Sequence, residues 1–151
     1  MAISRRSVVN NAVLSAAAVA VTGVSKFGVA ADGKDPIKVA TILDLSGGLD
    51  LYGKPMLDAI NLAAADINAA GGLLGRPVQM INYDAQSSMQ LYAQYAQQAA
   101  LKDRTSVVIG GITSASREVI RPVLDRFKTL YFYPTQYEGG VCDRNYFSSG
   151  S

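Results

Sequence analysis

The sequence has no histidine, no tryptophan and a single cysteine in 151 residues. Without histidine there is no imidazole for acid/base chemistry near neutral pH and no histidine metal ligand. Cys142 has no cysteine partner within this chain, and we expect it to be a small, partly buried free thiol. These absences exclude histidine-based catalysis and cysteine-pair metal sites, and we expect neither a metal nor a cofactor.

The chain also carries little net charge. The net charge is +2, but Arg5, Arg6 and Lys26 all lie in the first 31 residues, which contain no acid. The rest of the chain has 11 basic residues against 12 acidic ones. A nearly neutral body lacks the basic face of a nucleic-acid-binding protein, so we expect no nucleic-acid partner. The hydrophobic fraction of 49% and the charged fraction of 17% are typical of a globular α/β domain.

The first 31 residues have the three parts of an export signal. Arg5 and Arg6 precede a soft apolar run over residues 12–24, and small residues end at Ala31. The run is too short for a stop-transfer helix. The paired arginines resemble the twin-arginine export motif, with the general secretory route as the alternative. We therefore predict a partner in the export machinery and cleavage near Ala31.

Strand-like and helix-like patterns alternate along the remainder. Strands are predicted at residues 37–43, 78–83, 107–109 and 130–133, and helices at about 56–67, 89–100 and 115–127. We expect Pro55 to open the first helix, Ser87 or Ser88 to cap the second, and Pro122 to kink or delay the third. Such alternation predicts a doubly wound, mostly parallel sheet of flavodoxin-like order with right-handed crossovers. A further aromatic β segment begins near Tyr146, so the chain looks truncated.

Parallel sheets of this kind bind ligands at the carboxyl ends of their strands. The loops to consider are therefore residues 44–54, 84–88, 110–116 and 134–140. The first has neither the GxGxxG spacing of a dinucleotide site nor a P-loop, which disfavours an oxidoreductase. Ser46 either contacts a ligand there or belongs to a plain turn.

The loops after the third and fourth predicted strands hold the best candidate binding residues. Thr113 and Ser114 offer hydroxyl groups beside free N–H groups at a helix N-terminus, although Ser114 also suits a helix cap. Tyr133, Pro134 and Thr135 offer an aromatic wall, a fixed turn and a hydroxyl. No nucleophile and base can be paired among these residues, so we predict binding and not enzymatic catalysis.

These stretches resemble the type I periplasmic-binding-protein family. The resemblance spans about residues 36–151 and is carried by Leu43-Asp44-Leu45-Ser46-Gly47, Leu51-Tyr52-Gly53, Asp66-Ile67-Asn68-Ala69-Ala70-Gly71-Gly72-Leu73-Leu74-Gly75-Arg76-Pro77, Thr113-Ser114-Ala115-Ser116-Arg117 and Tyr133-Pro134-Thr135-Gln136-Tyr137-Glu138-Gly139. The last two stretches are similar to the branch that binds urea and short-chain amides. Leu51-Tyr52-Gly53 is closer to the binders of branched-chain amino acids.

The resemblance implies a two-lobed clamshell in the periplasm that delivers its ligand to an ABC permease in the inner membrane. Residues 32–151 would be its first lobe, with the second missing. Ser114 and Thr135 would hydrogen-bond urea or a small neutral amide, and Tyr133 and Ile112 would line the pocket. Because urea binders carry a large aromatic residue where Ile112 stands, formamide and acetamide stay open. A branched-chain amino acid ligand, or an amide sensor on the same fold, is the alternative. The candidate site is Ser46, Ile112, Thr113, Ser114, Tyr133, Pro134 and Thr135.

Overall fold

The computed structural model describes residues 35–150, so the predicted export signal lies outside the described residues. These residues form a five-stranded sheet in the order β2-β1-β3-β4-β5, and every neighbouring pair is parallel. The strands are β1 (Ile37–Leu43), β2 (Val78–Asp84), β3 (Val107–Gly110), β4 (Leu130–Tyr133) and β5 (Tyr146–Ser148). The predicted strands, the parallel sheet and the flavodoxin-like order are confirmed.

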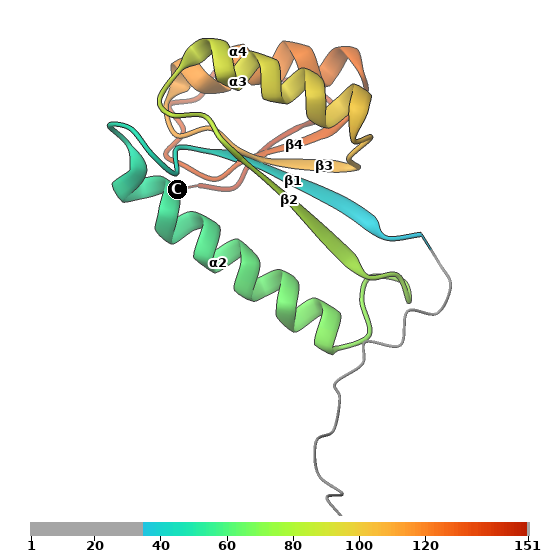
Figure 1. The fold of residues 1–151 in the computed structure, drawn as a ribbon. Coiled ribbons are helices and arrows are strands. Elements are labelled where there is room, and N and C mark those ends of the chain that lie inside the picture. The colour runs from blue at the N-terminus through green and yellow to red at the C-terminus, as the bar shows by residue number, and fades with distance from the viewer. Residues whose placement is uncertain (1–34, 151) are drawn as a thin grey trace, which may run out of the picture.

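Helices cover both faces of this sheet (Figure 1). Helix α2 (Asp50–Ala69) lies on one face, and α3 (Met89–Gln97) and α4 (Ser114–Arg126) lie together on the other. Helix α3 continues into one π-helical turn, Gln98–Lys102. Ser88 accepts a hydrogen bond from the backbone N–H of Leu91, which confirms one of the two predicted caps.

The larger core cluster lies under α3 and α4. It contains the fully buried side chains of Tyr92, Val108, Ile120, Leu124 and Tyr131. A smaller cluster under α2 is built around Val39, Ala64 and Val78. Burying such apolar area is the main favourable contribution to folding, so the helix pair on the larger cluster is the better anchored layer.

The first helix begins earlier than predicted, at Asp50, and Pro55 lies inside it. Asp50 pairs with Lys54 one turn later, with 2.6 Å between Oδ2 and Nζ, and an acid suits the first turn of a helix. Pro55 is exposed, so water can reach the carbonyl that loses its backbone partner. Helix α4 likewise begins at Ser114 and runs through the exposed Pro122, without a late start.

The connection between β4 and β5 has no helix, and the sequence predicts none after residue 127. Tyr137 and Val141 of this loop pack against the larger core cluster, in the layer of α3 and α4. Arg121 of α4 contacts Asp143 of the loop, with 3.2 Å between Nη1 and Oδ2. Cys142, also in this loop, is exposed, so the expected partial burial of its thiol is wrong.

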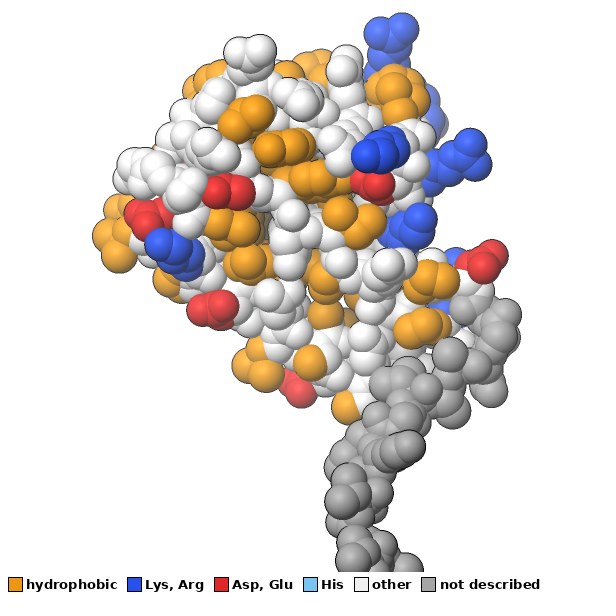
Figure 2. All heavy atoms as spheres, in the orientation of Figure 1, with side chains coloured by type: hydrophobic (Ala, Val, Ile, Leu, Met, Phe, Trp, Pro, Cys, Tyr) orange, Lys and Arg blue, Asp and Glu red, His pale blue; other side chains and the backbone are white. Residues whose placement is uncertain are grey.

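The opposite face of the sheet is covered less completely, since α2 packs against β1 and β2. Phe132 of β4 and Phe147 of β5 stack on this face with ring centroids 5.0 Å apart, and Phe147 is 44% exposed. Figure 2 shows apolar side chains exposed between the helix layers, while most visible lysines and arginines gather at the end where the strands begin. In this view, positive charge therefore concentrates away from the carboxyl ends of the strands. No helix within residues 35–150 is long and apolar enough to cross a membrane.

Candidate functional site

A surface cleft of about 710 Å³ lies at the carboxyl edge of the sheet, between the loops that follow β3 and β4. It is lined by Ile112, Thr113, Ser114, Tyr133, Gln136, Tyr137 and Glu138. Four of the seven predicted site residues thus share one cleft. Their contact with a ligand stays a prediction.

The N-terminus of α4 forms one wall of the cleft. Thr113 is its cap: Oγ1 accepts the backbone N–H of Ser116 at 3.1 Å, and the Ser116 hydroxyl accepts that of Thr113 at 3.0 Å. This reciprocal pair is a capping box, so the interpretation of Ser114 as the cap is wrong. Among the described residues, no acceptor reaches the backbone N–H groups of Ser114 and Ala115. The free N–H groups and the Ser114 hydroxyl are donors suited to a carbonyl or carboxylate oxygen.

Tyr133 forms the floor of the cleft. Its side chain is buried, and its hydroxyl donates to the carbonyl oxygen of Ile112 at 3.2 Å. Below it, the Tyr131 hydroxyl donates to the carbonyl of Gly110 at 3.0 Å. Two tyrosines of β4 therefore hold the loop after β3 in place, and the Tyr133 hydroxyl is already engaged.

Glu138 is the carboxylate of the cleft, and it is paired. Both of its oxygens accept hydrogen bonds from Arg117, each at 3.1 Å. The Arg117 bonds and the nearby Ser114 hydroxyl lower the pKa of Glu138 to about 2. The same pairing with Glu138 raises the pKa of Arg117, although burial opposes this. The carboxylate thus stays ionised near neutral pH, with its charge balanced by Arg117.

Sequence reasoning assigned no role to Arg117, Gln136, Tyr137 or Glu138. Arg117 and Glu138 enter the sequence analysis only as members of the two stretches that carry the family resemblance. A usable signal was the position of Arg117, one helical turn after Thr113, which places it beside the cleft.

Three predicted site residues lie outside the lining. Ser46 is exposed in the loop after β1, where its hydroxyl donates to Asp84 at 2.6 Å. Pro134 and Thr135 follow Tyr133 but do not line the cleft. Thr135 Oγ1 is buried without a partner, and its carbonyl lies against Gly150, where a Cβ would come within 2.0 Å. Ligand contacts from these three residues stay predictions.

Asp44, noted in the sequence as an acid of the mouth, is fully buried below the rim. Its Oδ2 atom and the Tyr92 hydroxyl are both buried and neither makes a hydrogen bond. Burial is the main reason that the pKa of Tyr92 is raised, and the Asp44 charge adds to it. The two groups therefore lie close enough to interact electrostatically, without a hydrogen bond between them.

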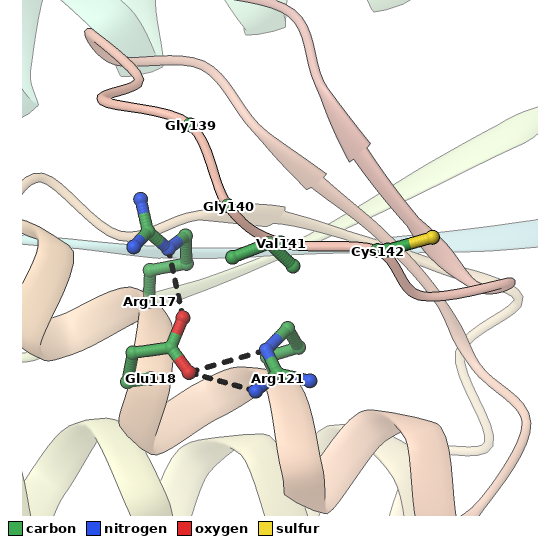
Figure 3. A pocket seen from close by; sticks show the side chains of 7 residues that line it. All are labelled: Arg117, Glu118, Arg121, Gly139, Gly140, Val141 and Cys142. Atoms are coloured by element: carbon green, nitrogen blue, oxygen red, sulfur yellow. Dashed lines mark hydrogen bonds and ion pairs between the residues drawn. The ribbon is translucent and has the colours of Figure 1, made fainter.

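A second hollow of about 400 Å³ lies on the far side of Arg117 (Figure 3). Arg117, Glu118 and Arg121 of α4 face the segment of residues 139–142 across it. Glu118 binds both arginines, at 3.0 Å from Arg117 Nε and 2.7 Å from Arg121 Nη2. The two arginines are also paired with Glu138 and Asp143, which lie outside the lining of this hollow. Within residues 35–150, no group of three histidine, cysteine or acidic residues could hold a metal ion.

Known proteins are similar to this chain in sequence. The "Leu/Ile/Val-binding protein" of Escherichia coli strain K12 is 28% identical over 112 residues, which cover 74% of this chain and 30% of that protein. The "Leu/Ile/Val-binding protein homolog 4" of Brucella abortus strain 2308 is 31% identical over 99 residues, covering 66% of this chain and 24% of that protein. The chain thus spans about a third or less of the relatives it matches.

Solved structures agree on the fold. The branched-chain amino acid transporter substrate binding protein LivJ from Streptococcus pneumoniae, in complex with isoleucine, superposes with a TM-score of 0.71 at 24% identity. That match covers 76% of this chain and 33% of the other. A periplasmic binding protein from Burkholderia mallei gives 0.60 at 28% identity, covering 66% of this chain and 26% of the other. These proteins are binding proteins, in line with the prediction that the chain is not an enzyme, and the sheet matches one lobe of the type I fold.

The sequence family described as "Periplasmic binding protein" matches residues 36–151. This match covers every described residue except the first. The chain therefore belongs to the periplasmic binding protein family.

Proposed function

We propose that this chain is the first lobe of an exported solute-binding protein that captures a small solute for an ABC importer. The observation that carries the proposal is the cleft between the loops after β3 and β4. It combines unpaired N–H groups at Ser114 and Ala115 with the aromatic floor of Tyr133. Such a half-site can hold the oxygen of a ligand while a second lobe closes over it and excludes water.

The leading ligand is an aliphatic amino acid such as leucine, isoleucine or valine. Its carboxylate would accept hydrogen bonds at the N-terminus of α4, and its side chain would lie against Ile112 and Tyr133. The relatives are named as Leu/Ile/Val-binding proteins, which supports this ligand better than the urea or short amide predicted from the sequence. The branched-chain alternative thus becomes the first choice.

Urea or a short-chain amide stays as the second candidate because of one observation. Glu138 is paired through both oxygens with Arg117, so the cleft has no unbalanced carboxylate for an ammonium group. A neutral amide needs only hydrogen-bond donors and acceptors, which the cleft provides.

The proposal is tested on the full-length mature protein by thermal shift and calorimetry. The panel contains leucine, isoleucine, valine, urea, formamide and acetamide. Stabilisation by the three amino acids supports the leading ligand, and stabilisation by the amides alone replaces it with the second candidate. If none of the six binds, the proposed function is wrong.

The family and the predicted export signal both support the periplasm as the proposed site of action. A membrane permease would recognise the closed, ligand-bound shape. Each neutral hydrogen bond contributes only about 1 kcal/mol, so the first lobe on its own is expected to bind weakly. Tight calorimetric binding by residues 32–151 alone would contradict a need for the second lobe.

A further inference from the structure

Arg117 lies in the first turns of α4 with only 5% of its side chain exposed. Its two terminal nitrogens each donate to one oxygen of Glu138 at 3.1 Å, and Nε donates to Glu118 at 3.0 Å. This fork geometry is specific to a guanidinium group, because a lysine ammonium is a single point of charge. Glu138 itself is 55% exposed, so its position in the cleft depends largely on Arg117.

Two rings of the cleft also pack on the same guanidinium. The central carbon of Arg117 lies 5.3 Å from the ring centroid of Tyr133 and 5.3 Å from that of Tyr137. The Tyr137 hydroxyl in turn accepts the backbone N–H of Val141 at 2.6 Å and donates to its carbonyl at 3.1 Å. One buried cation thus holds the floor, the outer wall and the carboxylate of the cleft in fixed relative positions.

We propose that Arg117 is the positioning residue that sets the charge selectivity of the cleft. By holding both oxygens of Glu138, it prevents this carboxylate from serving as the counter-ion of a cationic nitrogen on the ligand. The inference rests on the proposed function, since it concerns the same cleft. It adds that this lobe selects the oxygen end of a ligand and is indifferent to a positive charge at its nitrogen.

Loss of Arg117 would reverse this selectivity. In Arg117→Gln, the Glu138 carboxylate is free and about half exposed, so it attracts a nearby cation with the strength of an exposed ion pair. A ligand that carries a cationic nitrogen should then gain about two- to fivefold in affinity over the same ligand without it. In Glu138→Gln, Arg117 keeps only Glu118, which it shares with Arg121, so positive charge is in excess beside the cleft and the shift should have the opposite sign.

The experiment uses the full-length mature protein and two matched ligand pairs, measured by calorimetry. The first pair is leucine and 4-methylpentanoate, which lacks the ammonium group. The second is acetamidinium and acetamide, which lacks the positive charge. The readout is the affinity ratio within each pair for the wild type, Arg117→Gln, Glu138→Gln and the double variant. Arg121→Gln is the control, because Arg121 is also paired with Glu118 but does not line the cleft.

The proposal expects the ratio to rise in Arg117→Gln, to fall in Glu138→Gln, and to lie near the wild-type value in the double variant and in Arg121→Gln. A merely structural role of Arg117 would weaken both members of a pair equally and leave the ratio unchanged, which overturns the proposal. If Arg117→Gln does not fold, Glu138→Gln is the deciding variant, and an affinity ratio unchanged from the wild type overturns the proposal. A wild type that binds neither pair overturns the proposed function, and this inference falls with it.

Discussion

Asp44 directly follows β1 and Asp84 ends the neighbouring β2, and each carboxylate accepts at least one hydrogen bond from the loop that follows the other strand. Asp44 Oδ1 accepts the backbone N–H of Ser87 at 2.6 Å, in the loop after β2. Asp84 Oδ1 accepts those of Leu45 at 2.9 Å and Ser46 at 3.1 Å, in the loop after β1. This exchange ties two loops of the carboxyl rim together and gives Ser46 a structural contact, whatever its contact with a ligand.

Replacing Asp84 with asparagine should loosen this rim. Burial opposes ionisation of Asp84, but the Ser46 hydroxyl and three backbone N–H groups outweigh it and lower the pKa of the carboxyl group. An amide accepts fewer and weaker hydrogen bonds than a carboxylate, so Asp84→Asn is expected to cost about 1–2 kcal/mol in the free energy of unfolding. Urea denaturation checks this, with the exposed Asp58→Asn as a control that should change little. Equal effects of the two substitutions would refute the role of Asp84.

Ser114 and Thr113 should separate binding from stability. Ser114→Ala removes a donor of the cleft but no helix cap, so we expect about fivefold weaker ligand binding and little change in stability. Thr113→Ala removes the capping box and should cost about 1 kcal/mol in the free energy of unfolding. Both are measured in the full-length protein by calorimetry and denaturation. Loss of stability in Ser114→Ala, with none in Thr113→Ala, would restore Ser114 as the cap.

The Arg117–Glu138 pair predicts a stability change in acid. The pKa of Glu138 is lowered from 4.5 to about 2, so the unfolded chain binds its proton more readily than the folded one. The contribution of the pair is fully present above pH 4.5 and is lost as the pH falls toward about 2. The melting temperature of the wild type should exceed that of Glu138→Gln near neutral pH and converge with it in acid. An advantage that stays constant down to pH 2 would contradict the pairing.

Gly53 of α2 is expected to tolerate no side chain. A Cβ built there would lie 1.9 Å from the carbonyl oxygen of Asp44, so Gly53→Ala must push the helix away from the end of β1. We expect a loss of about 1–3 kcal/mol in the free energy of unfolding. Gly48→Ala is a matched control, since the nearest atom to its Cβ, the Ser87 hydroxyl, would be 4.0 Å away. Both are measured by denaturation, and equal stability of the two variants would show that α2 can move.

The strands and their order could be predicted because buried parallel strands are short apolar runs that local sequence reveals. The start of α2 could not, because it depends on the close approach of Gly53 to Asp44, a contact between separate elements. Nor does the sequence distinguish Thr113 from Ser114 as a cap. Both carry hydroxyls, and the extended backbone of Thr113 decides between them.

The sequence predicts the hydroxyl-bearing residues and the tyrosine that line the cleft. It does not predict the charged pair of Arg117 and Glu138. Ile112, Thr113 and Ser114 follow β3 and Tyr133 ends β4, so topology alone brings them to one edge of the sheet. The Arg117–Glu138 pair joins a helix to a loop whose path no periodic pattern reveals. The position of residues 134–140 as a loop is predicted, but its course is fixed by tertiary contacts such as those of Arg117 and Arg121.

The capping box of α4 also bears on how quickly a ligand is captured. Thr113 and Ser116 satisfy each other, so the protein's own hydrogen bonds hold the end of the loop after β3. A solute meeting this wall has no segment to organise, and its association should be limited by diffusion and by closure of the partner lobe. Differences in affinity among related solutes should then appear mainly in their dissociation rates.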